Sequence, residues 1–156
     1  MAIYLVQHGA CFSKDEDPKK SLTPEGRQAV AAVAGHLQAA GIKVAQVCHS
    51  GKTRARQTAR ILADQLAGGR TAEREGMKPL DDAPPFTEGL RDDDTMYVGH
   101  LPHMENVASC LTVGDETASL VKFTNGGVVC LEKDDSGYRI GWYVTPSLCR
   151  QTQTAL

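Results

Sequence analysis

The sequence contains little of what marks several large classes of protein. Only 5% of its 156 residues are aromatic, and there is a single tryptophan. No apolar run approaches the roughly 18 residues that a membrane-spanning helix needs, so we expect no membrane association. The formal net charge of -2 offers no basic excess for binding a polyanion, so we expect no nucleic-acid partner.

The five cysteines lie far apart, and no two of them form a C-x-x-C pair. An odd number without close spacing argues against a disulfide framework and a zinc–thiolate site, so we expect reduced thiols. The N-terminus lacks the basic and apolar segments of a signal peptide. We therefore expect a cytoplasmic protein with one domain over residues 1–156, whose core draws on 41% hydrophobic residues.

Apolar strands alternate with helical patterns through much of the chain. Strands are expected at residues 2–6, 44–48 and 96–98. A helix is expected after each strand: the first begins at Pro24 with Thr23 as its N-cap, the second follows residues 49–54, and the third runs from Pro102 to about Leu111. The segment 70–94 is predicted to be rich in loops, with a short helix near 85–90, and 127–133 and 138–144 are predicted to form a hairpin.

This order predicts an α/β fold, a three-layer α/β/α sandwich with a mainly parallel sheet and an antiparallel edge hairpin. Right-handed crossovers bring the carboxyl ends of the three early strands to one side of the sheet. His8, Arg54 and His100 follow those ends. We therefore expect the three side chains to meet at the rim where α/β proteins bind ligands.

Two histidines and an arginine beside a helix N-terminus suit the binding of an oxyanion. Arg54 lies in the first turn of a helix that Ser50 or Thr53 is expected to cap, and its guanidinium can bind two phosphate oxygens. A neutral His8 nitrogen can attack phosphorus, and His100 can bond a peripheral oxygen. Each residue taken singly also has a structural interpretation, as a strand-end histidine, a solvated arginine or part of a turn.

Four segments resemble motifs of the histidine phosphatase superfamily, which has the phosphoglycerate mutase-like fold. Residues 3–9 (IYLVQHG) are similar to LVRHG, and 22–27 (LTPEGR) to LTPxGR. Residues 50–59 (SGKTRARQTA) are similar to SPxxRARQTA, with Gly51 where proline is usual, and 98–102 (VGHLP) to VGHxP. The short stretch between Arg54 and Met96 has no room for an inserted helical subdomain, so the chain is most similar to the SixA branch.

The resemblance implies that His8 is the nucleophile and that Gln7, Arg54 and His100 complete a phosphate site, with no metal or cofactor. It implies a shallow pocket that suits phosphohistidine on another protein, such as a histidine phosphotransfer domain, and hence signal transduction. A small phosphorylated metabolite is the alternative substrate.

Two departures from the family pattern leave further alternatives open. Gln7 stands where arginine is usual, and an amide lacks the charge and the fork of a guanidinium. The protein is therefore also considered as a weakly active or inactive phosphate-binding homologue. No glutamate stands in an obvious place for a general acid, and Asp81 and Asp82 are the candidates. A phosphohistidine substrate demands less of an acid, because imidazole leaves more readily than an alkoxide.

Overall fold

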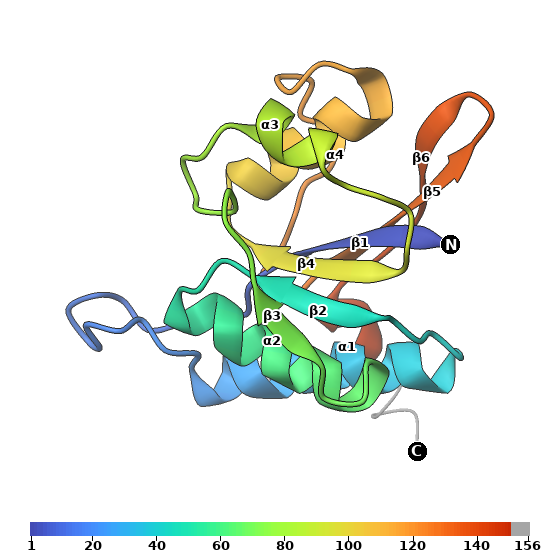
Figure 1. Cartoon of the computed structure of the whole chain (residues 1–156). Helices are drawn as coiled ribbons and strands as arrows, with labels where there is room; N and C mark the ends of the chain where they lie inside the picture. Colours follow the sequence, from blue (N-terminus) through green and yellow to red (C-terminus); the bar gives the residue numbers. More distant parts are fainter. Residues whose placement is uncertain (151–156) are drawn as a thin grey trace.

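A six-stranded sheet forms the middle layer of the structure, a computed structural model that describes residues 1–150 (Figure 1). The strand order is β3-β2-β4-β1-β5-β6. The strands, in chain order, are β1 (Ala2–Gln7), β2 (Gln46–His49), β3 (Thr71–Glu73), β4 (Thr95–Gly99), β5 (Val128–Asp134) and β6 (Gly137–Val144). β1, β2, β3 and β4 are parallel, whereas β5 runs antiparallel to both β1 and β6.

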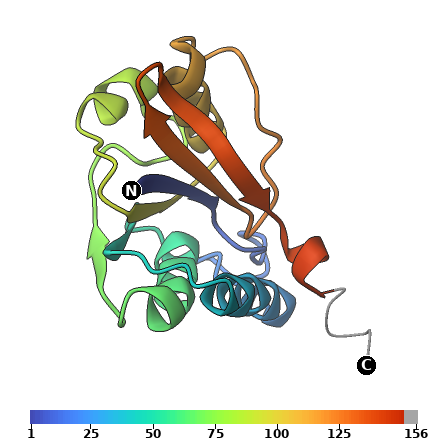
Figure 2. The same cartoon turned by 90° about the vertical axis from the view of Figure 1, so that its right-hand side faces the viewer.

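Helices cover both faces of the sheet (Figure 1, Figure 2). One face carries α1 (Pro24–Ala39), α2 (Thr53–Leu66) and α5 (Pro146–Arg150), and the other carries α3 (Ala83–Glu88) and α4 (His103–Val113). The arrangement confirms the predicted three-layer sandwich with an antiparallel hairpin at the edge of a mainly parallel sheet.

The apolar run of β1 is buried on both faces, as a central parallel strand requires. Tyr4 and Val6 pack in the core that α1 and α2 cover. Ile3 and Leu5 pack in the core beneath α3 and α4. Because the strand is buried as far as Val6, the polar residues that follow it emerge at the rim of the sheet.

The start of α1 is fixed by local chemistry that the sequence predicts. Thr23 caps the helix, since its hydroxyl accepts a 2.9 Å hydrogen bond from the Gly26 amide, and Pro24 occupies the first helical position. A Cβ atom at Gly26 would overlap the backbone carbonyl of Ala10. The first turn of α1 therefore packs directly on the chain that leaves β1.

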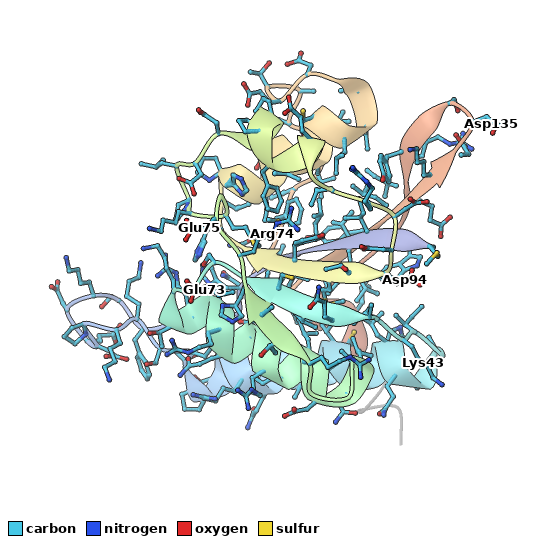
Figure 3. All side chains as sticks on the ribbon, viewed as in Figure 1. Lys43, Glu73, Arg74, Glu75, Asp94 and Asp135 are labelled. Atoms are coloured by element: carbon cyan, nitrogen blue, oxygen red, sulfur yellow. The ribbon has the colours of Figure 1, made fainter. Side chains whose placement is uncertain are left out.

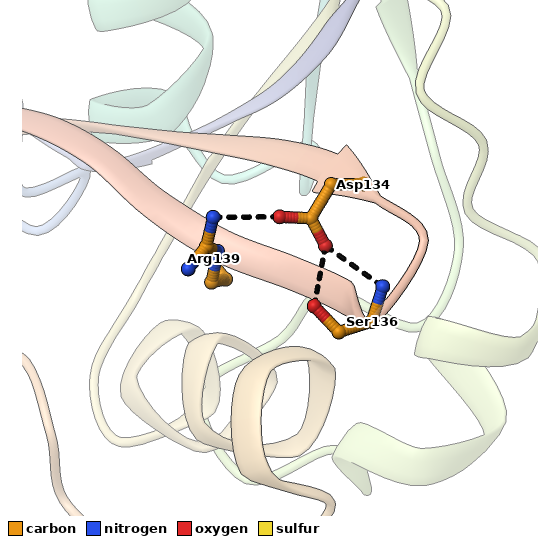
Figure 4. Close-up of polar contacts among 3 residues, drawn as sticks. All are labelled: Asp134, Ser136 and Arg139. Atoms are coloured by element: carbon orange, nitrogen blue, oxygen red, sulfur yellow. Dashed lines mark hydrogen bonds and ion pairs between the residues drawn. The ribbon is translucent and has the colours of Figure 1, made fainter.

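The turn between β5 and β6 is held by Asp134 (Figure 4). One of its carboxylate oxygens accepts hydrogen bonds from the amide and the hydroxyl of Ser136, at 2.9 and 2.7 Å. The other oxygen pairs with the Arg139 guanidinium at 2.7 Å. The hairpin forms where the sequence predicted it.

Two elements differ from the sequence prediction. β3 lies in the segment that was expected to be loop, and α5 follows the hairpin where no helix was expected. β3 is an edge strand that pairs with β2, and its three residues are too few to form a distinctive local pattern. Among the described residues, no helix is long and apolar enough to cross a bilayer.

Candidate active site

The carboxyl ends of β1, β2 and β4 bring His8, Arg54 and His100 together. The Arg54 Nε–H donates a hydrogen bond to the His8 Nε2 at 3.3 Å. The ring centroids of His8 and His100 lie 5.2 Å apart, with the rings tilted by 53°. The juxtaposition predicted from the three strand ends is therefore present, and it forms a compact group rich in hydrogen-bond donors.

The contacts of His8 define its tautomer. Its Nδ1 lies 2.7 Å from the carbonyl oxygen of Gly9, and a carbonyl can only accept, so Nδ1 carries the hydrogen. In the neutral ring Nε2 then holds the lone pair that faces Arg54. Burial lowers the His8 pKa to about 4, and the nearby Arg54 charge acts in the same direction. At neutral pH the imidazole is thus an uncharged base.

Gly9, the residue whose carbonyl orients His8, is held by α2 through its amide. The Gly9 amide donates to the Thr58 hydroxyl at 2.9 Å, and that hydroxyl donates to the Arg54 carbonyl at 2.8 Å. Thr58 is fully buried. The His8 carbonyl accepts from the Asn125 side-chain amide at 3.1 Å, which ties the end of β1 to the segment before β5.

The N-terminus of α2 is built differently from the expectation. Its N-cap is Lys52, with no side-chain capping bond, and Thr53 is the first helical residue. The prediction that Ser50 or Thr53 caps this helix is therefore wrong. The Ser50 hydroxyl accepts a long 3.4 Å hydrogen bond from the Lys52 amide and is otherwise engaged by His100.

His100 is almost completely buried, with 1% of its surface exposed. Its Nε2 lies 2.6 Å from the Ser50 hydroxyl, whereas its Nδ1 is buried and has no hydrogen-bonding partner in the described part of the chain. Burial lowers the His100 pKa to about 3, and nearby charges that include the Arg54 guanidinium add to the effect. This ring is therefore also neutral at pH 7.

Gln7 is one of the predicted site residues that the structure does not tie to His8, Arg54 and His100. Its backbone pairs with Gly99 in the sheet, and its carbonyl accepts from the Gly126 amide at 2.9 Å. Its side-chain Oε1 is buried without a partner among the described residues. The amide makes no hydrogen bond to His8 or Arg54 there, so it does not replace the charged fork of an arginine in this structure.

Asp81 and Asp82 lie beside the end of β3. They line a pocket of about 480 Å³ together with Arg74, Glu75 and Phe86. Figure 3 shows Arg74 and Glu75 at this end of the sheet, with Lys43 and Asp94 toward the opposite end. Asp81 accepts a 2.8 Å hydrogen bond from the Lys78 amide. Within residues 1–150, neither aspartate hydrogen-bonds or pairs with His8, Arg54 or His100.

Sequence reasoning missed the supporting roles of Thr58, Ser50 and Asn125. The position of Thr58 could have been predicted, since a residue four positions after Arg54 lies on the same face of the helix. Asn125 gives no local signal, because its contact with His8 spans 117 residues. In the described part of the chain, no group of three or more His, Cys, Asp or Glu side chains is arranged to hold a metal ion.

Comparison with known proteins identifies a family whose model matches this sequence. Residues 3–80 match the histidine phosphatase superfamily (branch 1), so the match spans half of the chain and includes both His8 and Arg54. An uncharacterized protein of Picosynechococcus sp. is 28% identical over 140 residues, which cover 84% of each chain.

Solved structures share the fold. The protein histidine phosphatase SixA complexed with tungstate aligns with a TM-score of 0.80 and 20% identity, over 95% of this chain and 99% of that one. The phosphoserine phosphatase of Entamoeba histolytica, in complex with 3-phosphoglyceric acid, aligns with a TM-score of 0.70 and 15% identity, over 92% and 96%. The fold is thus the phosphoglycerate mutase-like, SixA-type α/β sandwich. With half of its sequence matched, including three of the four motifs, the chain belongs to the histidine phosphatase superfamily.

Proposed function

We propose that residues 1–156 form one phosphatase domain that removes the phosphoryl group from phosphohistidine on a protein. The His8 Nε2 attacks phosphorus and forms an N–P bond while the N–P bond of the substrate breaks. The substrate imidazole leaves with a proton supplied by the solvent. Water then attacks the phosphohistidine intermediate on His8, which releases inorganic phosphate and restores the free imidazole.

The observation that carries this proposal is the pair of hydrogen bonds on His8. The bond from Nδ1 to the Gly9 carbonyl leaves the Nε2 lone pair on the side of Arg54. A nucleophile has to be unprotonated, and burial keeps this ring neutral at pH 7. An incoming phosphoryl group is attracted to the Arg54 guanidinium, which brings phosphorus to the lone pair.

Stabilisation of the transferring group falls to Arg54 and His100. The guanidinium neutralises charge on the phosphoryl oxygens, and we propose that the Nδ1 of His100, which is buried without a partner among the described residues, bonds a further oxygen. Gln7 contributes an uncharged amide at most. A site with one arginine turns over more slowly than one with two, because each donor to the developing charge contributes roughly 10²–10³ in rate.

A protein substrate is supported by the likeness to the SixA structure that is named a protein histidine phosphatase. It is also supported by the chemistry of the leaving group. Imidazole departs readily once it is protonated, so the reaction does not depend on a protein carboxylate beside His8. We propose a histidine phosphotransfer domain as the partner that carries such a group, and with it a role in cytoplasmic signal transduction.

The test compares His8→Ala with His36→Ala on a phosphohistidine-labelled protein. His36 is an exposed histidine of α1 and serves as the matched control. We expect His8→Ala to abolish phosphate release and labelling of the enzyme, and His36→Ala to retain both. Release that survives in His8→Ala overturns the mechanism. Wild-type protein that binds the substrate without forming a labelled His8 is a phosphate-binding homologue rather than an enzyme.

A small phosphoester is the second candidate substrate, and the structural likeness to the phosphoserine phosphatase favours it. Such a reaction needs a proton donor for the alkoxide, and Asp81 and Asp82 are the proposed acids. Asp81→Asn and Asp82→Asn should then slow phosphoserine turnover and spare that of phosphohistidine. Phosphoserine turnover that is unaffected in both variants eliminates these aspartates as acids.

A further inference from the structure

The contact between Ser50 and His100 assigns Ser50 a role in the site. Ser50 follows β2 and is 7% exposed, and its hydroxyl lies 2.6 Å from the His100 Nε2. We propose that Ser50 is a positioning residue that holds His100 in the tautomer with its hydrogen on Nδ1, so that Nδ1 donates to the phosphoryl group. The donation to a phosphoryl group rests on the proposed function, whereas the tautomer itself does not.

Counting hydrogen-bonding groups selects this tautomer. If the Ser50 hydroxyl donates to Nε2, its lone pair still accepts from the Lys52 amide at 3.4 Å, and only the Nδ1–H of His100 lacks a partner. If Nε2–H donates to Ser50 instead, the serine hydrogen has no acceptor among its described contacts and the Nδ1 lone pair has no donor. The first arrangement leaves one buried group unpaired and the second leaves two, so the first is favoured.

A doubly protonated His100 would offer a donor without any help from Ser50. Burial opposes that charge and lowers the His100 pKa far below neutrality, and the positive side chains of Arg54 and Lys52 oppose it further. A neutral ring has one hydrogen to give. Whether His100 presents a donor or an acceptor to a ligand therefore depends on what its Nε2 contacts.

His8 and His100 then share a tautomer and use it in opposite ways. In His8 the Nδ1 hydrogen is engaged by the Gly9 carbonyl, which leaves the Nε2 lone pair for attack. In His100 the Nε2 lone pair is engaged by Ser50, which leaves the Nδ1 hydrogen for donation. A single oxyanion at this site can meet a nucleophile from one ring and a donor from the other.

The first measurement is a nitrogen-15 NMR spectrum of the ring nitrogens of the unliganded full chain at pH 7. We expect a protonated Nδ1 and an unprotonated Nε2 for His100. In Ser50→Ala the ratio of the two tautomers should change about five- to tenfold, which is the effect of losing one hydrogen bond of ordinary strength. Ser50→Thr keeps the hydroxyl and should restore the wild-type ratio.

The second measurement is the affinity for inorganic tungstate, an oxyanion that probes the site without turnover. Ser50→Ala should bind tungstate about tenfold more weakly than wild type. Ser109→Ala is the matched control, because Ser109 is also buried and also accepts a 3.4 Å hydrogen bond from a backbone amide, that of Leu120. It should leave both the His100 tautomer and the tungstate affinity unchanged.

A wild-type spectrum with the hydrogen of His100 on Nε2 overturns the proposal without the need for any variant. So does an unchanged tautomer ratio in folded Ser50→Ala. If the wild-type protein fails to hydrolyse phosphohistidine, the proposed function fails, but the spectrum still decides the role of Ser50. The two proposals are therefore refuted by different results.

Discussion

Replacement of Thr58 by valine removes the hydroxyl that joins α2 to the end of β1 and nearly preserves the side-chain shape. The buried Gly9 amide loses its acceptor, whereas the Arg54 carbonyl keeps its helical partner. A buried unpaired amide costs about 1–3 kcal/mol. We expect the free energy of unfolding to fall by that amount, and the Tm to fall by roughly 2–4 °C for each kcal/mol.

The same substitution acts on the proposed nucleophile, because the Gly9 carbonyl orients the Nδ1 of His8. We expect a fall in kcat of roughly tenfold or more on phosphohistidine, since small misplacements of reacting groups have large effects on rate. Urea denaturation and kcat are to be measured for Thr58→Val and for Thr58→Ser. The serine variant keeps the hydroxyl and loses one buried methyl group, worth about 0.8 kcal/mol. If the valine variant is as stable and as active as the serine variant, the hydroxyl relay has no role.

Three further predictions follow from the same structure. Gln7→Arg should raise kcat on phosphohistidine at least tenfold by adding a guanidinium to the site; an unchanged kcat would mean that the amide does not limit the rate. Gly26→Ala should destabilise the protein by about 3 kcal/mol or more in urea, because its Cβ meets backbone, whereas Gly35→Ala, with open space in the same helix, should stabilise it by about 0.5–1 kcal/mol. Acid should destabilise the fold. The pKa values of His8 and His100 in the folded protein are about 4 and about 3, below the value of 6.5 for an unperturbed histidine. As the pH falls below 6.5, the unfolded chain therefore binds more protons than the folded protein. The free energy of unfolding should then drop by up to about 1.4 kcal/mol per pH unit for each histidine, and a flat profile in urea titrations between pH 7 and pH 5 would contradict their burial.

The parts of the fold that could be predicted from sequence are those with a local cause. Thr23 and Pro24 mark a helix start through bonds that span three residues, and the structure has the helix there. The apolar run of β1 ends at a polar pair because burial ends there. The convergence of His8, Arg54 and His100 required only the handedness of crossovers and the order of the elements.

The parts that could not be predicted depend on contacts between distant residues. Ser50 is of a residue type that often caps helices, but its hydroxyl contacts His100, which lies 50 residues away in the chain. β3 becomes a strand because β2 offers it an edge, and its three residues carry no pattern of their own. The residue pattern of a single sequence does not reveal such contacts between distant residues.

Gly51 shows how one departure from a family motif can change the backbone. It adopts a φ of 92°, which the ring of the usual proline forbids, since proline fixes φ near about −65°. A Cβ at this position would also lie 2.8 Å from the carboxyl carbon of Glu73. The chain entering α2 therefore follows a path that requires glycine, and the substitution in the motif reflects that path.

The hydrogen bond from Arg54 to His8 has a consequence for the resting enzyme. Before a ligand arrives, the Arg54 Nε–H bonds the His8 Nε2 lone pair that we propose attacks phosphorus. An uncharged electrophile does not attract the guanidinium, so the hydrogen bond from Arg54 to the His8 Nε2 lone pair stays in place. An oxyanion binds the guanidinium more strongly than a neutral imidazole does, and so releases the lone pair as it docks. The negative charge of the substrate would therefore free the His8 Nε2 lone pair for the proposed attack.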